Sequence, residues 1–342
     1  MTTWLQRIWL QGIAARLASA LLIFGLLDAA TGAKAQAPEP VSVIVFPGGF
    51  NWPIWIAQEK GYFAKGGIEV KLTNTPNSVF QLTNLIDGKF DIAITAIDNV
   101  IAYMEGQGEA PTATKPDLIA FMGGDNGFLS LVTVPEVKSY ADLKGRTVSV
   151  DALTTGYAFV LLDMLKRNGL QQGDYKVEKA GGVLARWEAI KEKKHDGTML
   201  ITPFDILAKA NGLNVLQYAI DLYGNYQGLV AAARRSWAAE HPKAVEAYIR
   251  GTIAGVDFLL DPANKDEAIA ILRKNLPQMS EAVAAQSHAL MAGTKGFTPK
   301  AAFNADGVRK VLELRSEYGE PKKALSDPMK YYDATYYQAA TR

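Results

Sequence analysis

Short apolar runs alternate with segments of helical periodicity along the first two thirds of the chain. Residues 41–46, 91–95 and 117–122 are apolar runs bounded by turn residues, which is the pattern of buried strands. Residues 78–88 have helical spacing of apolar positions, with a serine at the start and a glycine at the end. The same alternation resumes after the glycine-rich stretch 123–127. Strands that alternate with helices predict an α/β fold, with parallel sheets covered by helices on both faces.

The pattern becomes mostly helical from Gly228 onward, and residues 241–261 have an apolar face at helical spacing. A terminal block with hardly any strands of its own must pack on an existing sheet, so we expect it to return to the first domain. The predicted organisation is a lobe 1 of residues 36–126 plus 228–342 and a lobe 2 of residues 127–227, joined by two crossovers.

The first 35 residues have the order of a cleavable secretory signal peptide. Arg7 and Arg16 precede an apolar run of eleven residues, 17–27, and small residues follow it. The run is shorter than the roughly 20 residues that a membrane-spanning helix needs. Cleavage after Ala35 is favoured, because a cut two residues later would leave Pro38 beside the scissile bond. We therefore expect a protein exported to the periplasm.

The composition excludes several classes of function. The chain has no cysteine, which excludes disulfides, thiolate metal ligands, thiol nucleophiles and a lipid anchor on a cysteine at the cleavage site. Its 36 basic and 35 acidic residues nearly balance, so no basic excess points to nucleic acid.

The chain also lacks the common motifs of metal binding and catalysis. His195, His241 and His288 are scattered and form no H-E-x-x-H pair. Neither a G-x-S-x-G elbow nor a phosphate-binding loop with its lysine occurs. We expect neither a metal nor a cofactor, and a protein that is not an enzyme.

Five segments of the chain carry a resemblance to a known family through their order and spacing. The chain resembles the substrate-binding proteins of bacterial ABC importers, in particular the group that handles aliphatic sulfonates, taurine, nitrate and thiamine precursors. The segments are residues 51–72, 139–150, 154–170, 196–208 and 241–261. The resemblance implies a periplasmic-binding-protein fold of type II, in which two lobes close on a solute by hinge motion. It also implies a monomeric receptor that docks on an ABC permease at the inner membrane.

The position of the site follows from the predicted sheets. Ligands of open parallel sheets bind beyond the carboxyl ends of the strands, and clefts between domains are the usual small-molecule pockets. This selects the loops between strands and helices and the return crossover. The predicted ligand-binding residues are Phe50, Asn51, Trp52, Asp98, Asn126, Thr154, Thr155, Gly156, Tyr157, Arg186, Pro203, Asp205 and Tyr226.

Two of these groups have a clear chemical role. Phe50 and Trp52 offer an aromatic stacking wall, with Asn51 as a polar handle between them. Thr154, Thr155 and Gly156 open a helix, where unpaired amides and two hydroxyls suit a carboxylate, a sulfonate or a ring oxygen. The family places ligand contacts at this second position.

The charged candidates have two interpretations each. Asp98 and Asp205 stand near helix starts, where a carboxylate is favourable in any case, but in a pocket they favour an amine or a heterocycle N–H over a bare anion. Arg186 either neutralises an acidic ligand or belongs to a surface or interlobe ion pair.

We expect a periplasmic receptor that captures a small organic molecule, such as a sulfonate, an aromatic or a pyrimidine-like compound. One alternative is a periplasmic sensor that presents its ligand to a receptor kinase. Another is an enzyme related to thiamine-precursor synthesis, but that relative uses a cysteine-rich iron site and this chain has no cysteine.

Overall fold

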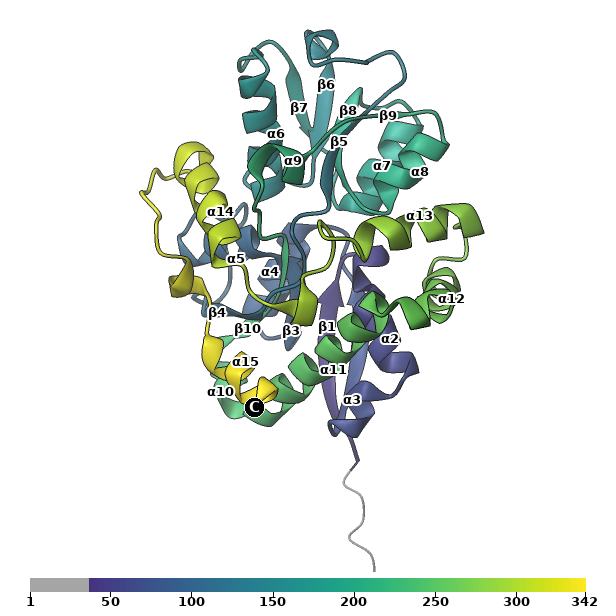
Figure 1. Ribbon diagram of the computed structural model, residues 1–342. Helices are drawn as coiled ribbons and strands as arrows, with labels where there is room; N and C mark the ends of the chain where they lie inside the picture. Colours follow the sequence, from purple (N-terminus) through teal and green to yellow (C-terminus); the bar gives the residue numbers. More distant parts are fainter. Residues whose placement is uncertain (1–36) are drawn as a thin grey trace, which may run out of the picture. The chain divides into compact units, whose positions relative to one another are not determined.

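A computed structural model describes residues 37–342 (Figure 1). The predicted signal peptide, residues 1–35, lies outside the described residues. Within residues 37–342, no helix has the length and apolar character needed to cross a membrane.

The described chain forms two five-stranded sheets with helices on their faces (Figure 1). We call the first sheet with its helices the first lobe and the second sheet with its helices the second lobe. The first sheet has the order β2-β1-β3-β10-β4, and the second the order β7-β6-β8-β5-β9. The strands are β1 Glu39–Val45, β2 Ile68–Asn74, β3 Ile92–Ala96, β4 Leu118–Met122, β5 Leu129–Thr133, β6 Thr147–Val150, β7 Lys176–Lys179, β8 Gly197–Ile201, β9 Asn214–Tyr218 and β10 Leu229–Arg234.

The helices occur close to where the apolar periodicity predicts them, and the α/β class is confirmed. The helices before β10 are α2 Trp52–Glu59, α3 Tyr62–Lys65, α4 Ser78–Ile86, α5 Ile97–Met104, α6 Gly156–Arg167, α7 Val183–Lys191, α8 Phe204–Ala210 and α9 Ala219–Tyr223. Those after it are α10 Arg235–Glu240, α11 Pro242–Leu260, α12 Lys265–Asn275, α13 Glu281–Met291, α14 Ala305–Tyr318 and α15 Ala334–Thr341.

The expectation of purely parallel sheets is wrong at one strand in each sheet. β10 runs antiparallel to both β3 and β4, and β5 runs antiparallel to both β8 and β9. Each of these strands is the first that the chain forms after crossing from the other sheet. After the crossover the chain enters the new sheet at the edge where the parallel strands of that sheet end. Its first strand there therefore runs antiparallel to its neighbours.

The crossovers connect β4 to β5 and β9 to β10. The exact lobe boundaries, which the sequence analysis places after residues 126 and 227, stay a prediction.

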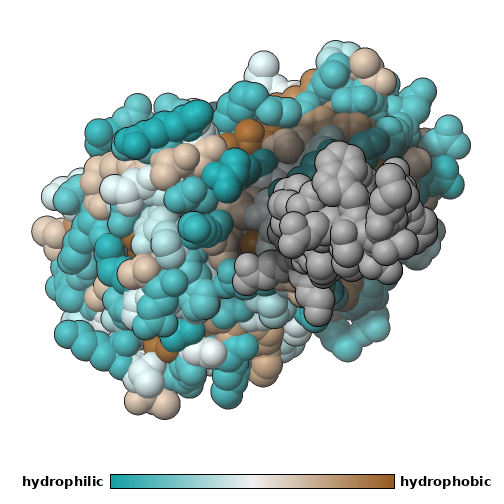
Figure 2. Space-filling model, turned by 90° about the horizontal axis from the view of Figure 1, so that it is seen from below, coloured by the Kyte–Doolittle hydropathy of each residue, from teal (hydrophilic) through white to brown (hydrophobic). Residues whose placement is uncertain are grey.

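The long helix α11 closes the core of the first lobe over α2 and α3. Its predicted apolar face is largely buried, with Val245, Tyr248 and Ile249 fully enclosed. Close approach requires a glycine at one point: a Cβ on Gly255 would overlap the Pro53 carbonyl of α2. Hydrophilic residues predominate on the face that Figure 2 shows, as expected when most large apolar side chains lie in the core.

The C-terminal segment is fastened to the first lobe at Glu105. The Glu105 carboxylate accepts hydrogen bonds from the Tyr331 hydroxyl (2.8 Å) and from the amines of Lys323 (3.0 Å) and Lys330. Burial raises the pKa of the Glu105 carboxyl, but these partners outweigh burial and lower that pKa to about 2. Tyr332 stacks on Phe303, with ring centroids 3.9 Å apart.

Candidate functional site

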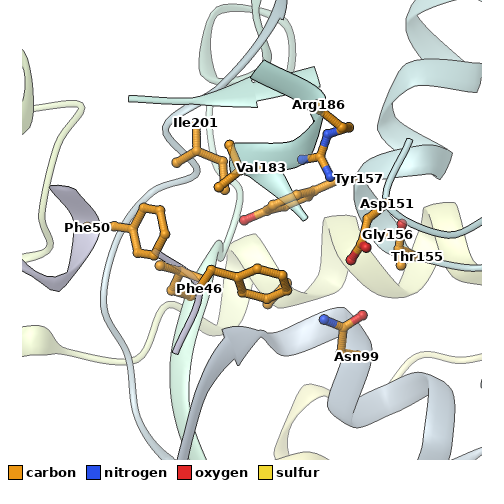
Figure 3. A pocket seen from close by; sticks show the side chains of 12 residues that line it. Phe46, Phe50, Asn99, Asp151, Thr155, Gly156, Tyr157, Val183, Arg186 and Ile201 are labelled. Carbon is orange, nitrogen blue, oxygen red and sulfur yellow. The ribbon is translucent and has the colours of Figure 1, made fainter. Parts of the chain in front are cut away.

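A pocket lies between the two sheets, at the edge where their parallel strands end (Figure 3). Phe46 follows β1, Asp151 follows β6, and Ile201 is the last residue of β8. Both lobes therefore contribute to the wall, as the position of ligands in open α/β sheets leads one to expect. The lining residues are Phe46, Phe50, Ala96, Asn99, Asp151, Thr155, Gly156, Tyr157, Val183, Arg186, Ile201 and Leu229.

Arg186, on α7, is the principal donor of the pocket. Its Nε donates to the Met199 carbonyl (3.1 Å) and its Nη1 donates to the Gly181 carbonyl (2.6 Å). Within residues 37–342 no carboxylate lies within 4.0 Å of this guanidinium, although only 3% of the residue is exposed. Burial lowers the pKa of Arg186. A buried cation without an anionic partner is costly, so this arginine suits a ligand atom that accepts hydrogen bonds.

Asp151 supplies the complementary acceptor. Its Oδ2 accepts the backbone N–H of Ser78 across the seam between the lobes (3.0 Å). Its Oδ1 is buried and has no hydrogen-bond partner among the described residues. An unpaired buried acceptor suits an N–H donor on the ligand. The Asn99 amide, which also lines the pocket, donates to the Thr95 hydroxyl (2.9 Å).

The opposite side of the pocket is apolar. Figure 3 shows the rings of Phe46 and Phe50 and the side chains of Val183 and Ile201 on this side, away from Asp151 and Asn99. Tyr157 extends into the pocket beside the Arg186 guanidinium (Figure 3). Burial raises the pKa of the Tyr157 phenol well above its usual value, so the phenol is a neutral hydroxyl. The arrangement suits a flat ring with polar atoms on one edge.

A second buried arginine, Arg315 on α14, lies beside the pocket and is fully paired. Its Nε and Nη2 each donate to the Asp98 carboxylate at 2.5 Å, and Nη2 also donates to the Thr154 carbonyl (2.6 Å). The guanidinium lies over the Phe159 ring, 4.8 Å from its centroid. A Cβ on Gly156 would overlap the Asp98 carboxylate. The Asp98 carboxylate thus lies directly against the start of α6, where the sequence predicts contact with a ligand, and Thr155 and Gly156 of this start still line the pocket.

Further hydrogen bonds join the lobes around this pair. Gly182 N donates to the Pro76 carbonyl (2.8 Å), and Thr154 N donates to Glu109 Oε2 (3.2 Å). Glu109 also pairs with Lys179. The lobes are therefore held together along one side of the pocket.

Several predicted site residues lie outside the pocket. Trp52 is completely buried, and its indole N–H donates to the Ala268 carbonyl (2.8 Å), so it anchors α2 to α12. The Asn51 amide donates to the carbonyls of Phe46 (2.7 Å) and Gly48 (3.2 Å) and shapes the loop that carries Phe50.

The remaining predicted residues belong to the second lobe and the crossovers. Asp205 is buried and accepts the Tyr218 hydroxyl (2.9 Å), while burial raises its pKa. The Tyr226 ring is buried, with its centroid 6.4 Å from that of Tyr157. Asn126 lies in the first crossover, where its backbone N–H donates to the Gly296 carbonyl (3.3 Å). Pro203 is the N-cap residue directly before α8 and does not line the pocket.

The predicted residues that line the pocket are Phe50, Thr155, Gly156, Tyr157 and Arg186. The lining residues that the sequence analysis did not predict are Phe46, Ala96, Asn99, Asp151, Val183, Ile201 and Leu229. Phe46 and Asp151 are each the residue directly after a strand, so a strict application of the strand-end rule would have found them. Among residues 37–342, no group of three or more His, Asp or Glu side chains is placed to hold a metal ion.

Comparison with known proteins identifies the family. The model of the NMT1/THI5-like family matches residues 51–265, well over half of the chain. The chain therefore belongs to the NMT1/THI5-like family.

Two relatives with curated names share about a quarter of their aligned residues with this chain. A riboflavin-binding protein, RibY of Chloroflexus aurantiacus, is 26% identical over 235 residues, which cover 66% of this chain and 63% of the relative. A 4-amino-5-hydroxymethyl-2-methylpyrimidine phosphate synthase of Uromyces fabae is 25% identical over 232 residues, which cover 62% and 64%. The chain thus spans less than two thirds of the length of each relative.

Solved structures share the fold at low identity. A Bordetella bronchiseptica protein superposes with a TM-score of 0.74 at 19% identity and covers 90% of this chain and 98% of its own. The nitrate-binding protein NrtA of Synechocystis gives 0.72 at 14%, covering 89% and 88%. The ligand-binding component of an ABC-type import system of Staphylococcus aureus gives 0.70 at 12%, covering 88% and 99%. These likenesses confirm the predicted periplasmic-binding-protein fold.

Proposed function

We propose that this protein is the solute-binding component of an ABC importer, working in the periplasm and delivering a small organic molecule to a membrane permease. The observation that carries the proposal is Arg186, a buried guanidinium without a carboxylate partner, in a pocket lined by both lobes. A binding site accounts for an unpaired buried cation that packing alone does not require. The ABC-import component with the same fold and the family membership support the transport role.

The solute is a flat heteroaromatic ring with a hydrogen-bond acceptor next to an N–H donor. Arg186 donates to the acceptor, Asp151 Oδ1 receives the N–H, and Phe46 and Phe50 contact the ring. A plain sulfonate or nitrate would leave the Asp151 oxygen unpaired and would face its negative charge. Pyrimidines and flavins have the required edge, in keeping with the named ligand of the Chloroflexus relative.

Binding is expected to draw the lobes together. The seam bonds from Ser78 to Asp151 and from Gly182 to Pro76 form only when the lobes meet. Since Asp151 also faces the pocket, one carboxylate joins the seam to the ligand. Hinge closure of this kind is the general mechanism of two-lobe binding proteins.

A thermal-shift screen tests this function. The panel contains uracil, cytosine, riboflavin, benzoate, taurine and nitrate, and the variant Arg186→Gln provides the comparison. A ligand at 100 times its dissociation constant stabilises the folded protein by about 2.7 kcal/mol. We expect heterocycles with adjacent C=O and N–H groups to raise the melting temperature, and the variant to show a much smaller shift at the same ligand concentration. A shift from nitrate or taurine alone would contradict the proposed ring.

The relative named as a pyrimidine phosphate synthase makes an enzymatic role the second candidate. The ligand that the screen identifies decides between the two. A binding protein returns one equivalent of unchanged ligand per chain after denaturation, whereas an enzyme of this kind returns a new product.

A further inference from the structure

A third stretch of chain runs beside the two crossovers. It consists of residues 293–304, between α13 and α14, and we call it the strap. The Thr298 N–H of the strap donates to the Gly124 carbonyl of the first crossover (2.9 Å). Phe297 and Asp125 form an isolated antiparallel bridge between the same two segments. The strap is therefore paired with the chain at the point where it leaves the first lobe.

The second crossover is joined to the strap through Gln227, whose side chain is completely buried. The Gln227 amide nitrogen donates to the carbonyls of Asp125 (3.2 Å) and Leu229 (2.9 Å). The Gln227 side-chain oxygen accepts the backbone N–H of Asn304 (2.8 Å). One side chain thus connects the first crossover, the second crossover and the strap. Because a buried amide needs its hydrogen-bond partners, these contacts hold the three segments in one arrangement.

The strap also leads to contacts with the second lobe on both sides. Near its start, Lys295 pairs with Asp221 of α9. Beyond its end, α14 packs against α5 of the first lobe and against α6 of the second. Tyr318 of α14 stacks there on Phe159 of α6, with ring centroids 5.9 Å apart. A movement of the second lobe relative to the first therefore has to move or break contacts of the strap and of α14.

We propose that the strap is a third segment of the hinge and that Gln227 is a positioning residue, which fixes the angle at which the two lobes meet. The inference goes beyond the proposed function, because it concerns the protein without its solute. Hinges are commonly a few loop residues that absorb the change in backbone angles. Two short crossovers alone leave the interlobe angle loosely defined, whereas a third segment hydrogen-bonded to both of them narrows it.

Gln81 provides a matched control within a single lobe. It is also completely buried, and its amide donates to the carbonyls of Ile44 (3.2 Å) and Ile94 (3.0 Å), both in the first sheet. Gln227→Met and Gln81→Met each remove a buried amide that has two backbone acceptors, with little change in volume. Both variants should lose stability, since they leave buried backbone groups without partners. Only Gln227→Met should change the interlobe angle.

The interlobe distance can be measured directly, because the chain has no cysteine. Lys65→Cys on α3 and Lys194→Cys beyond α7 place one spin label at an exposed site on each lobe. Double electron–electron resonance without solute should give the same narrow distance distribution for the labelled parent protein and for Gln81→Met. Gln227→Met should give a broader distribution with a shifted mean.

An unchanged distribution in Gln227→Met, together with a loss in the free energy of unfolding like that of Gln81→Met, overturns the inference. Equal broadening in Gln81→Met also overturns it, because the change would then reflect a general loosening of the fold. If Gln227→Met does not fold, Phe297→Leu reduces the contact of the strap with Phe128 of the first crossover, whose ring centroid lies 5.0 Å from that of Phe297. It should broaden the distribution to a smaller extent, and an unchanged distribution overturns the inference.

These measurements contain no solute, so they are independent of the thermal-shift screen. A broader distribution in Gln227→Met supports the strap even if no heterocycle binds, and binding of a heterocycle does not support the strap if the distribution is unchanged.

Discussion

Two buried arginines lie close to the same pocket, and their surroundings differ. Arg315 is completely buried, makes two hydrogen bonds to the Asp98 carboxylate and stacks on Phe159. Arg186 is nearly as buried but has only two backbone carbonyls as partners. The first arginine is satisfied within the protein, whereas the second has no carboxylate within 4.0 Å among the described residues, and Asp151 faces it only across the pocket.

The difference indicates separate roles: Arg315 stabilises the folded structure, and Arg186 is available to bind a ligand. Arg315 links α14 and α5 of the first lobe to the Thr154 carbonyl of the second, so its pairing holds the seam. Arg186 faces the pocket, where an incoming acceptor completes its hydrogen bonding. Removing the first should therefore cost stability, and removing the second should cost affinity.

The largest effect should come from Arg315→Met, which leaves the Asp98 carboxylate buried and unpaired. Breaking a buried ion pair by removing one partner typically costs 3 to 5 kcal/mol, so we expect a loss of about that size in the free energy of unfolding. Urea denaturation measures it. The double variant Asp98→Asn with Arg315→Met removes both charges and should recover part of the loss. A loss below about 1 kcal/mol in the single variant would contradict the structural role of the pair.

Arg186→Gln should give the opposite result. We expect affinity for the solute to fall by about 2 kcal/mol or more, roughly thirtyfold, because the variant removes a buried charged donor. The free energy of unfolding should stay the same or increase, since an unpaired buried cation is lost. Calorimetry and urea denaturation measure the two quantities. Arg186→Lys keeps the charge without the planar fork and should recover only part of the affinity.

Asp125, a buried acid at the first crossover, can be compared with the two arginines. Its carboxylate accepts hydrogen bonds only from backbone N–H groups, those of Gly127 and Leu229. Burial raises the pKa of the Asp125 carboxyl to about 7. Because the folded state then holds a proton that the unfolded state releases, Asp125 contributes less stability as the pH rises from about 4 to 7. We expect a loss on the order of 2 kcal/mol between pH 5 and 7.

The pH dependence is tested by urea denaturation of wild-type protein and Asp125→Asn across this range. The free energy of unfolding of the variant should change less with pH than that of the wild-type protein, even if the variant is more or less stable at every pH. Equal slopes would mean that Asp125 does not titrate in this window.

The smallest effect should come from the interlobe pair of Glu109 and Lys179, whose lysine is exposed. The Lys179 side chain is 55% exposed, and ion pairs of this kind typically contribute between 0 and 1 kcal/mol. Lys179→Met should therefore reduce solute affinity by no more than a few fold, and less at 0.5 M salt than at 0.05 M. A loss as large as that of Arg186→Gln would show that the exposed pair, rather than the pocket, controls closure.

The local pattern of apolar and polar residues predicts most of the helices and strands. It fails where contacts with residues far away in the sequence determine the structure of a segment. Residues 228–235 favour a helical interpretation because three consecutive alanines are strong helix formers, but pairing with β3 and β4 makes Leu229–Arg234 a strand. Phe50 and Tyr157 are predicted because they follow strands, and strand ends are visible in the sequence.

Trp52 and Asp98 look equally suitable in the sequence, but their partners lie more than 200 positions away. Trp52 pairs with the Ala268 carbonyl and Asp98 with Arg315, and nothing within either local segment indicates these contacts. Arg186 shows the reverse case. Nothing in its local sequence distinguishes it, and only the structure shows that its guanidinium is buried with two backbone carbonyls as hydrogen-bond partners.

The position of β10 also determines the order in which the protein can fold. β3 and β4 do not pair with each other, because β10 lies between them. The first lobe therefore cannot complete its sheet until residues 229–234 have left the ribosome, after the strands of the second lobe. A nascent chain that stops short of this point holds the three-stranded fragment β2-β1-β3 with an exposed edge at β3, and β4 without a partner strand in that sheet. Completion of the lobe that begins first along the chain is thus one of the last events in its synthesis.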